Sequence, residues 1–378
     1  MSATAARTAS RWDHYLLRRG GECASFWKDY LADSNRQLLL ILGLGFDPRM
    51  CLGLRMLLEA RPSCVKQCLL IEYDEGANSP SHQYGALVKS NRDGLSSLLG
   101  HPGAIQTARV PMWSDDRRRR TGSRRASDVI QPNILERFTD IVVDVSAMPR
   151  GIYFPLIAKI LFLLDASTGA APSTNLHVIV PENITMDRSI QEEGIDDDAS
   201  YMHGFASDLV QESTAAVPRV WIPVLGEGKE EQIIRLYDYV KPDEICPVLP
   251  SPSVNPRRAD DLIAEYRAIL FDRLRVEPQN IIYASEWNPF EVYRQIYRTM
   301  ERYNSALQAL DKCKIVVSAL SSKLLSVGAL LAACEGKRNG LMVGISHVET
   351  HGYRIQKQLA ASDAELFTLW IAGECYNA

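Results

Sequence analysis

The sequence has no long apolar run. None of its segments approaches the ~18 uninterrupted apolar residues of a membrane-spanning helix, and the most apolar one, residues 152–164, contains Lys159 in its middle. Residues 1–12 contain no acidic residue, but they also lack the apolar segment of a secretory signal, so a disordered tail is expected there. We therefore expect a cytoplasmic protein.

Cysteine is sparse and dispersed. The chain has eight cysteines, and only Cys64 and Cys68 lie close together, without a second pair or a histidine cluster nearby. A disulfide framework is not indicated, and we expect no bound metal. Several cysteines lie within apolar runs, where a free thiol packs as a small hydrophobe, which is typical of a reducing compartment.

The chain has no excess of basic charge. Its 42 basic and 46 acidic residues give a net charge of −4, and 46% of its 378 residues are hydrophobic, which is enough for a sizeable core. Binding to a polyanion through overall charge is therefore not expected.

Charge is concentrated in two segments, a basic loop at residues 115–127 and an acidic loop at residues 191–200. The basic loop holds six arginines: Arg117, Arg118, Arg119, Arg120, Arg124 and Arg125. We expect both loops to be solvated insertions with few core contacts, able to pair with each other. The alternative for Arg117–Arg125 is a contact with a phosphate or a polyanion, although no aromatic residues are interleaved to stack bases.

Short apolar runs alternate with longer segments of helical periodicity along the chain. This pattern predicts an α/β fold with Rossmann-like, mostly parallel sheets and helices on both faces, built as two similar halves. We expect strands at 37–42, 67–72, 140–145, 175–180, 219–224, 244–249, 280–284, 314–318 and 340–345. We expect helices at 50–60, 91–99, 153–164, 230–240, 259–274, 289–310 and 322–333.

The expected organisation has three parts. Residues 1–36 form an N-terminal tail and helix, residues 37–215 a first Rossmann-like unit with both charged loops, and residues 216–378 a second α/β unit. Residues 247–256 contain four prolines, so no helix can cross them.

Ligands of doubly wound sheets bind outside the carboxyl ends of the strands, where helix N-termini present free N–H groups. After the first expected strand, Gly43 and Gly45 allow a tight turn and a close backbone approach, and Asp47 and Arg49 follow. The second strand ends in acidic residues, of which Glu72 is placed to accept hydrogen bonds from a ribose.

These residues carry a resemblance. Residues 43–49 (GLGFDPR) followed by 72–74 (EYD) resemble the first two motifs of carboxyl methyltransferases that use S-adenosylmethionine, over residues 39–89. The resemblance implies that Gly43, Gly45 and Arg49 face the methionine part of the cofactor and that Glu72 binds its ribose, with Asp74 beside it. Position 48 is Pro where that family usually has Thr. A general Rossmann-like turn, with Pro48 as the first helical residue, explains the same letters.

A second cofactor-binding cluster is expected at Ser321, Ser322 and Lys323, where an expected strand leads into a helix. Hydroxyl donors, helix N–H groups and one positive charge together suit an anion such as a phosphate. The cluster lacks the glycines of a P-loop, and a capped helix with an exposed lysine is the structural alternative.

Three residues are candidate acids or bases. Asp144 ends a strand in a polar cluster with Ser146 and Arg150, although Ser146 also suits a helix cap. Glu286 precedes the helix that Asn288 is expected to cap, and capping leaves the Glu286 side chain unexplained. His347 follows the last strand and is a candidate for acid–base catalysis or ligand contact.

These observations favour a protein that binds a nucleotide or nucleotide-derived ligand and senses or processes it. An S-adenosylmethionine-dependent methyltransferase and a non-catalytic scaffold are the alternatives. Residues 284–290 (ASEWNPF) and 321–328 (SSKLLSVG) together also resemble uncharacterised Rossmann-like proteins of bacterial defence systems and mobile elements, which implies a nucleotide-linked role there. The sequence leaves open whether there is turnover, and whether the chain binds a second copy of itself or another protein.

Overall fold

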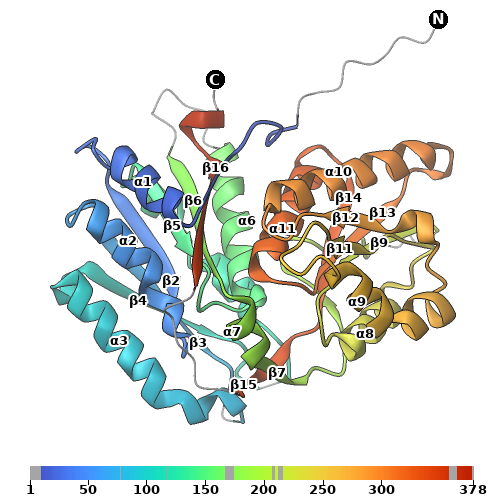
Figure 1. The fold of residues 1–378 in the computed structure, drawn as a ribbon, viewed down its shortest axis with the longest axis horizontal. Coiled ribbons are helices and arrows are strands. Elements are labelled where there is room, and N and C mark those ends of the chain that lie inside the picture. The colour runs from blue at the N-terminus through green and yellow to red at the C-terminus, as the bar shows by residue number, and fades with distance from the viewer. Residues whose placement is uncertain are drawn as a thin grey trace, which may run out of the picture.

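Two β-sheets lie side by side with helices on both faces of each (Figure 1). The structure is a computed structural model, and it describes residues 10–76, 78–116, 118–166, 174–206, 209–211, 216–356 and 364–376. The expected α/β fold with two Rossmann-like halves is confirmed. Within the described residues, no helix is long and apolar enough to cross a membrane.

The first sheet has seven strands in the order β1-β16-β6-β5-β2-β3-β4. The strands from β6 to β4 are parallel, and β16 is antiparallel to both β6 and β1. Their bounds are β1 (Leu16–Arg19), β2 (Leu38–Gly43), β3 (Val65–Asp74), β4 (Ile105–Pro111), β5 (Asp140–Asp144), β6 (Asn175–Glu182) and β16 (Glu365–Ala372). The helices of this half are α1 (Gly21–Tyr30), α2 (Leu52–Ala60), α3 (Gly85–Leu99), α4 (Gly122–Asp128), α5 (Pro132–Leu135), α6 (Arg150–Ala166) and α7 (Ile184–Ser189).

The second sheet follows the order β12-β11-β9-β13-β14-β8, with β10 paired to β9. All of these pairings are parallel except that of β14 with β8. The strands are β8 (Ser200–Tyr201), β9 (Arg219–Val224), β10 (Glu244–Ile245), β11 (Val248–Pro250), β12 (Ile282–Ala284), β13 (Lys314–Ala319) and β14 (Met342–His347). The helices are α8 (Glu230–Val240), α9 (Arg258–Glu265), α10 (Pro289–Ala306) and α11 (Lys323–Arg338). A two-stranded ribbon of β7 (Ile190–Ile195) and β15 (Thr350–Ile355) joins the halves.

The parallel strands of the two halves follow the same winding. In each half the first parallel strand, β2 or β9, lies in the middle of the sheet. The next two parallel strands are added on one side of it and the last two on the other side, giving β4-β3-β2-β5-β6 and β12-β11-β9-β13-β14. This is the strand order of a Rossmann-like unit, in which the winding reverses between the first and fourth strands. The reversal points, or switch points, lie between β2 and β5 and between β9 and β13.

One apolar core runs through both halves. It includes Ile152 and Ile157 on α6, Leu331 on α11 and Phe290 on α10. Helix α6 is apolar around most of its circumference, so it is buried between the sheets rather than lying on a surface. Near the N-terminus, Trp12 donates a hydrogen bond to the Ile371 carbonyl at 3.0 Å and packs edge-on against a tyrosine ring of α10.

Two strands pair with the sheet on the other side of the expected division at residue 216. Strand β16 lies beyond that boundary but belongs to the first sheet, between β1 and β6. Strand β8 lies before it but pairs with β14 of the second sheet. The rule of alternating strands and helices misses both, because each is an antiparallel addition that no crossover helix accompanies.

The expectation of two solvated loops is also partly wrong. Strand β7 (Ile190–Ile195) includes the first five residues of the acidic segment, and helix α4 (Gly122–Asp128) includes the last six residues of the basic segment, where Ala126 is fully buried. The expected pairing between the segments is confirmed, since Arg120 makes two hydrogen bonds to Asp196, at 2.7 and 2.8 Å. Arg117 lies outside the described residues.

Candidate functional site

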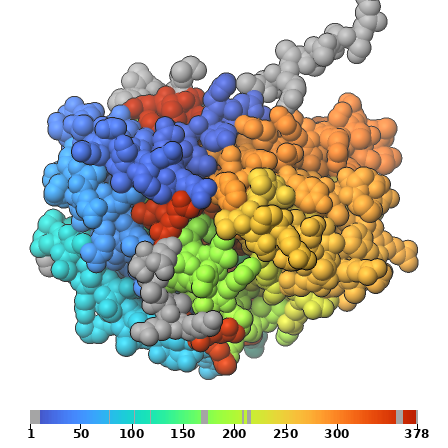
Figure 2. Space-filling model, in the orientation of Figure 1, coloured from blue at the N-terminus to red at the C-terminus, as the bar shows by residue number. Residues whose placement is uncertain are grey.

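A cavity of about 1070 Å³ lies where the carboxyl ends of the two sheets meet. Figure 2 shows the first half, blue to green, packed against the second half, yellow to orange. Residues 182–192, at and after the end of β6, line much of this cavity, and residues 286–287 after β12 line it as well. Four further loops that line it follow the central strands of the two sheets: residues 45–47 after β2, 146–150 after β5, 226–229 after β9 and 320–323 after β13. These are the loops of both switch points, so the two positions at which Rossmann-like units bind ligands open into one shared space.

Asp47 and Arg49 form a buried ion pair in the first of these loops. Asp47 caps the 3₁₀ helix at residues 48–51 and accepts hydrogen bonds from Arg49 Nε and Nη2, at 3.0 and 2.7 Å. Arg49 is 1% exposed, also pairs with Asp187 at 2.8 Å, and donates to the Pro181 carbonyl at 3.3 Å. All three guanidinium nitrogens therefore have protein partners, so Arg49 ties the β2 loop to the segment after β6.

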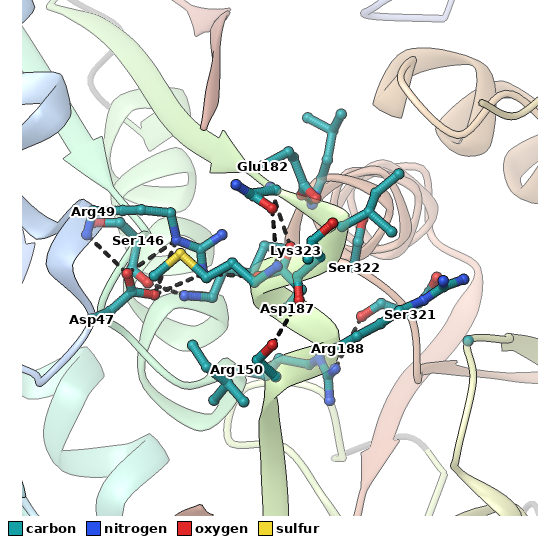
Figure 3. A pocket seen from close by; sticks show the side chains of 18 of the residues that line it. Asp47, Arg49, Ser146, Arg150, Glu182, Asp187, Arg188, Ser321, Ser322 and Lys323 are labelled. Carbon is teal, nitrogen blue, oxygen red and sulfur yellow. Dashed lines mark hydrogen bonds and ion pairs between the residues drawn. The ribbon is translucent and has the colours of Figure 1, made fainter. Parts of the chain in front are cut away.

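The N-terminus of α11 is joined to the first half by three polar contacts (Figure 3). Lys323 Nζ donates to the Ser146 carbonyl, and Arg150 Nη2 donates to the Ser321 carbonyl at 3.0 Å. The Leu324 N–H is one of the amides at the helix end that have no partner within the helix, and it donates to Glu182 Oε1 at 2.7 Å. The sequence placed Lys323 at an anion site, and the structure places a protein carboxylate beside it.

Ser321 and Ser322 differ in what they contact. The Ser322 hydroxyl caps α11 by accepting from the Leu325 N–H at 3.4 Å. The Ser321 hydroxyl lines the cavity and is buried, at 7% residue exposure, and it has no hydrogen-bond partner among the described residues. A buried hydroxyl without a partner is costly, so Ser321 is suited to a ligand that supplies one.

Three ionisable groups at this end of the cavity have shifted pKa values. Burial raises the pKa of Asp144 from 3.8 to about 6, although hydrogen bonds from Ser146 oppose the shift. Burial and the neighbouring charge of Asp187 raise the pKa of Glu182 from 4.5 to about 7. Burial lowers the pKa of Lys323, which Asp47 opposes. The charge at this end of the cavity therefore changes near neutral pH.

Gly43 and Gly45 serve packing. A Cβ atom on Gly43 would lie 2.4 Å from Met148 Cγ, and one on Gly45 would lie 2.9 Å from the Tyr73 hydroxyl. Both glycines let the β5 loop lie directly against the end of β2. Gly45 also lines the cavity.

Glu72 and Asp74 do not line this cavity. Glu72 pairs with Arg92 at 3.1 Å and lies 3.9 Å from Arg109, while Asp74 accepts from the Gly76 N–H at 2.8 Å. Side chains alternate between the two faces of a strand, so Tyr73 is the residue of this strand end that faces the cavity. The ribose contact expected of Glu72 would therefore have to be made outside this cavity.

The candidate catalytic residues are dispersed. Asp144 is buried beneath the β5 loop near Lys323. Glu286 lines the cavity, where it pairs with Arg258 and accepts from the Val254 N–H at 2.7 Å. His347 lies instead at a neighbouring small cavity of about 30 Å³, with its Nε2 atom 3.3 Å from the Ser200 hydroxyl. The structure does not bring these three side chains together.

Sequence reasoning missed part of the site. Gly226 and Gly228 in the turn after β9 could have been found by the rule that selected Gly43 and Gly45. Glu182 and Glu192 carry no local signal, because their partners come from other elements. Glu192 was expected to be solvated, but it is paired with Lys229 at 2.6 Å, and although burial opposes this, Lys229 and Arg150 hold its pKa below the ordinary value.

The fold and the cavity define a doubly wound α/β protein with two Rossmann-like halves around one site. No family model matches the chain, and no curated protein matches it. Solved structures with some similarity include a protein described as a universal stress protein from Pseudomonas aeruginosa UCBPP-PA14 (11% identity, TM-score 0.22, 84% of this chain and 94% of that chain). A functionally unknown protein from Pseudomonas aeruginosa PAO1 (12%, 0.21, 82% and 91%) and a universal stress protein from Archaeoglobus fulgidus DSM 4304 (10%, 0.23, 81% and 95%) are similar to the same degree. TM-scores this low assign neither a fold family nor a function.

Proposed function

We propose that this protein binds a nucleotide or nucleotide-derived ligand in the cavity between its halves, to sense or process it. The observation that carries this proposal is the convergence of four switch-point loops on one space. Each switch point places helix N-termini and backbone N–H groups at the carboxyl edge of its sheet, which favours phosphate groups.

The charges of the cavity favour a polar ligand. Seven basic residues line it: Arg19, Arg49, Arg150, Arg188, Lys229, Arg258 and Lys323. Seven acidic residues also line it: Asp47, Glu182, Asp187, Glu192, Glu227, Glu286 and Glu365. Many of these residues are already paired with one another, so a ligand must offer its own polar groups in exchange. A phosphate-bearing ligand offers such groups. A purely apolar ligand would remove water from these charged side chains without forming hydrogen bonds or ion pairs with them in return.

Within the cavity, the N-terminus of α11 is the better phosphate position. It offers the Ser321 hydroxyl, which has no hydrogen-bond partner among the described residues, together with the Lys323 side chain, whose ammonium group contacts only a neutral carbonyl, that of Ser146, in the hydrogen bonds given above. The loop before α8, residues 226–229, has no hydroxyl side chain to offer. Its Gly228 N–H donates to a Glu265 carboxylate oxygen at 2.8 Å, and its Lys229 N–H donates to the Tyr266 hydroxyl at 2.8 Å.

S-adenosylmethionine is the second candidate ligand. It is favoured because Gly45, Asp47 and Arg49 of the motif at residues 43–49 line this same cavity. The pairing of Glu72 with Arg92 outside the cavity weighs against it. Identification of the ligand would also test the proposed role in bacterial defence, since that role depends on recognition of a nucleotide.

The test is a binding screen with the purified protein against ADP, NAD⁺, cyclic dinucleotides and S-adenosylmethionine, with adenosine as the phosphate-free control. Ser321→Ala removes a hydroxyl that has no hydrogen-bond partner among the residues the structure describes, so we expect the unliganded melting temperature to stay the same. Affinity for the phosphate-bearing ligand should fall about tenfold, as for the loss of one hydrogen bond to a charged group. Ser305→Ala, exposed at the end of α10, is the matched control. Equal affinity of the Ser321 variant and wild type would contradict the proposal, and selective binding of S-adenosylmethionine would favour the methyltransferase alternative.

A further inference from the structure

The carboxylate of Glu182 occupies the position that an anionic ligand would take. Glu182 ends β6 in the first half, and its Oε1 atom accepts the Leu324 N–H of the second half at 2.7 Å. This amide is one of the free donors at the start of the sixteen-residue helix α11, where a negative charge is favoured by the helix dipole. Next to it, the Ser321 hydroxyl is buried in the cavity without a hydrogen-bond partner among the described residues.

The surroundings of Glu182 disfavour the charged form of its carboxyl group at this position. The ionisable groups that face it from the elements packed around β6 are Asp187 on α7, Arg49 after β2, Lys323 on α11 and Tyr153 on α6. Arg49 is engaged by Asp47 as well as Asp187, and Lys323 by the Ser146 carbonyl, so neither cation is dedicated to Glu182. Burial and Asp187 together raise the pKa of Glu182 to about 7, which means that its charge is readily lost near neutral pH.

We infer that Glu182 is a resident competitor for the anion site at the N-terminus of α11, and that an anionic ligand binds there only when the Glu182 side chain is protonated or withdrawn. This inference rests on the proposed function and names the side chain that controls ligand binding at this site. Binding of the anion is then coupled to uptake of a proton, so affinity falls as pH rises through the pKa of Glu182.

The expected effect is large enough to measure. If only the protonated form of Glu182 admits the anion, affinity should be about tenfold weaker at about pH 8 than at about pH 6. Glu182→Gln cannot carry the competing charge, so its affinity should vary with pH much less than that of wild type and should be about tenfold tighter than wild type at about pH 8. Asp144, on the neighbouring strand β5, has a pKa raised to about 6. Its titration adds to the pH dependence of affinity near about pH 6, both in wild type and in the Glu182→Gln variant.

The experiment is isothermal titration calorimetry of the full chain with NAD⁺ and, separately, with inorganic sulfate. Both probes keep a constant charge between about pH 6 and pH 8, so any pH dependence belongs to the protein. Titrations in two buffers with different ionisation enthalpies count the protons taken up. Glu365→Gln is the matched control, because it removes one carboxylate from the same cavity while leaving α11 untouched, and it should keep the pH dependence of wild type.

The experiment distinguishes failure of the competitor role of Glu182 from failure of the proposed function. If wild type binds a probe with no pH dependence and no proton uptake, or if Glu182→Gln has the same profile as wild type, the competitor role is wrong and the binding site stands. If neither protein binds any anion or nucleotide at any pH, the proposed function itself is wrong. Should Glu182→Gln not fold, Glu182→Asp shortens the side chain away from the Leu324 amide, and tighter binding at pH 8 is again the expected result.

Discussion

Asp144 shows how one buried carboxyl group links the site to the stability of the fold. Its Oδ1 atom accepts the Ser146 N–H at 2.9 Å, while Oδ2 has no hydrogen-bond partner in the described part of the chain. Burial raises its pKa to about 6 in the folded protein, above its ordinary value of 3.8. The folded state therefore holds this proton more tightly than the unfolded state, and the contribution of Asp144 to stability falls as pH rises from about 4 to about 6.

We predict that Asp144→Asn stabilises the protein at alkaline pH. The amide keeps the acceptor for the Ser146 N–H and carries no charge. A shift of about two pKa units corresponds to about 3 kcal/mol, so the variant should gain up to this amount at about pH 8 and almost nothing at about pH 4. Urea denaturation at the two pH values measures the difference. An equal change at both would show that the charge of Asp144 is not the cause.

At the scale of the element, the sequence predicted the interior strands and helices well and the edges poorly. The strand at 219–224 and the helix at 230–240 have the expected bounds, because each has a strong local pattern of burial. Strand β4 was missed because it lies at the edge of its sheet and only one of its residues is buried, so it has no apolar run. Residues 259–274 were expected to form one helix, but α9 ends at Glu265 and a π-helical turn follows at residues 268–273.

The arginine-rich segment contains both structural and exposed charges. Arg120 lies over the Trp113 ring, 3.9 Å from its centre, and pairs with Asp196 with little exposure of either side chain. Arg124 is 74% exposed and lies 4.0 Å from Asp128. Whether the exposed arginines contact a polyanion remains a prediction of the sequence.

We predict that Arg120→Ala destabilises the protein by about 1.5–3 kcal/mol, the usual cost of losing hydrogen bonds between charged and partly buried groups. Arg124→Ala, from the same segment, should change stability by less than about 0.5 kcal/mol, because exposed ion pairs contribute little. Chemical denaturation of the two variants side by side makes the comparison. Equal losses would mean that the link between the two charged segments is not structural.

At the scale of the whole molecule, the halves are not independent units. One apolar cluster includes residues of both sheets and of the helices α6, α10 and α11 between them. The polar contacts of Lys323, Arg150 and Glu182 join the same two halves at the cavity. Strand β16 further ties the C-terminal part of the chain into the first sheet.

We predict a single cooperative unfolding transition for the full chain, because neither half can expose its side of the shared core without cost. Differential scanning calorimetry should give equal calorimetric and van't Hoff enthalpies. A saturating ligand in the cavity should raise the whole transition, by about 2.7 kcal/mol at a concentration 100 times its dissociation constant. Two separate transitions, with only one of them shifted by ligand, would contradict this account.

The sequence by itself determined the class of fold and the loops in which a site could lie. Apolar periodicity is a local property, and the rule that ligands bind at the carboxyl ends of parallel strands needs only the order of the elements. It therefore identified Gly45, Asp47, Arg49 and residues 321–323, which all line one cavity. Only the tertiary structure decided that the two sets of loops face each other, since each half is specified by its own pattern. It also decided that Glu72 faces away and that Glu182 meets the Leu324 amide, 142 positions along the chain, because such contacts depend on how the halves pack.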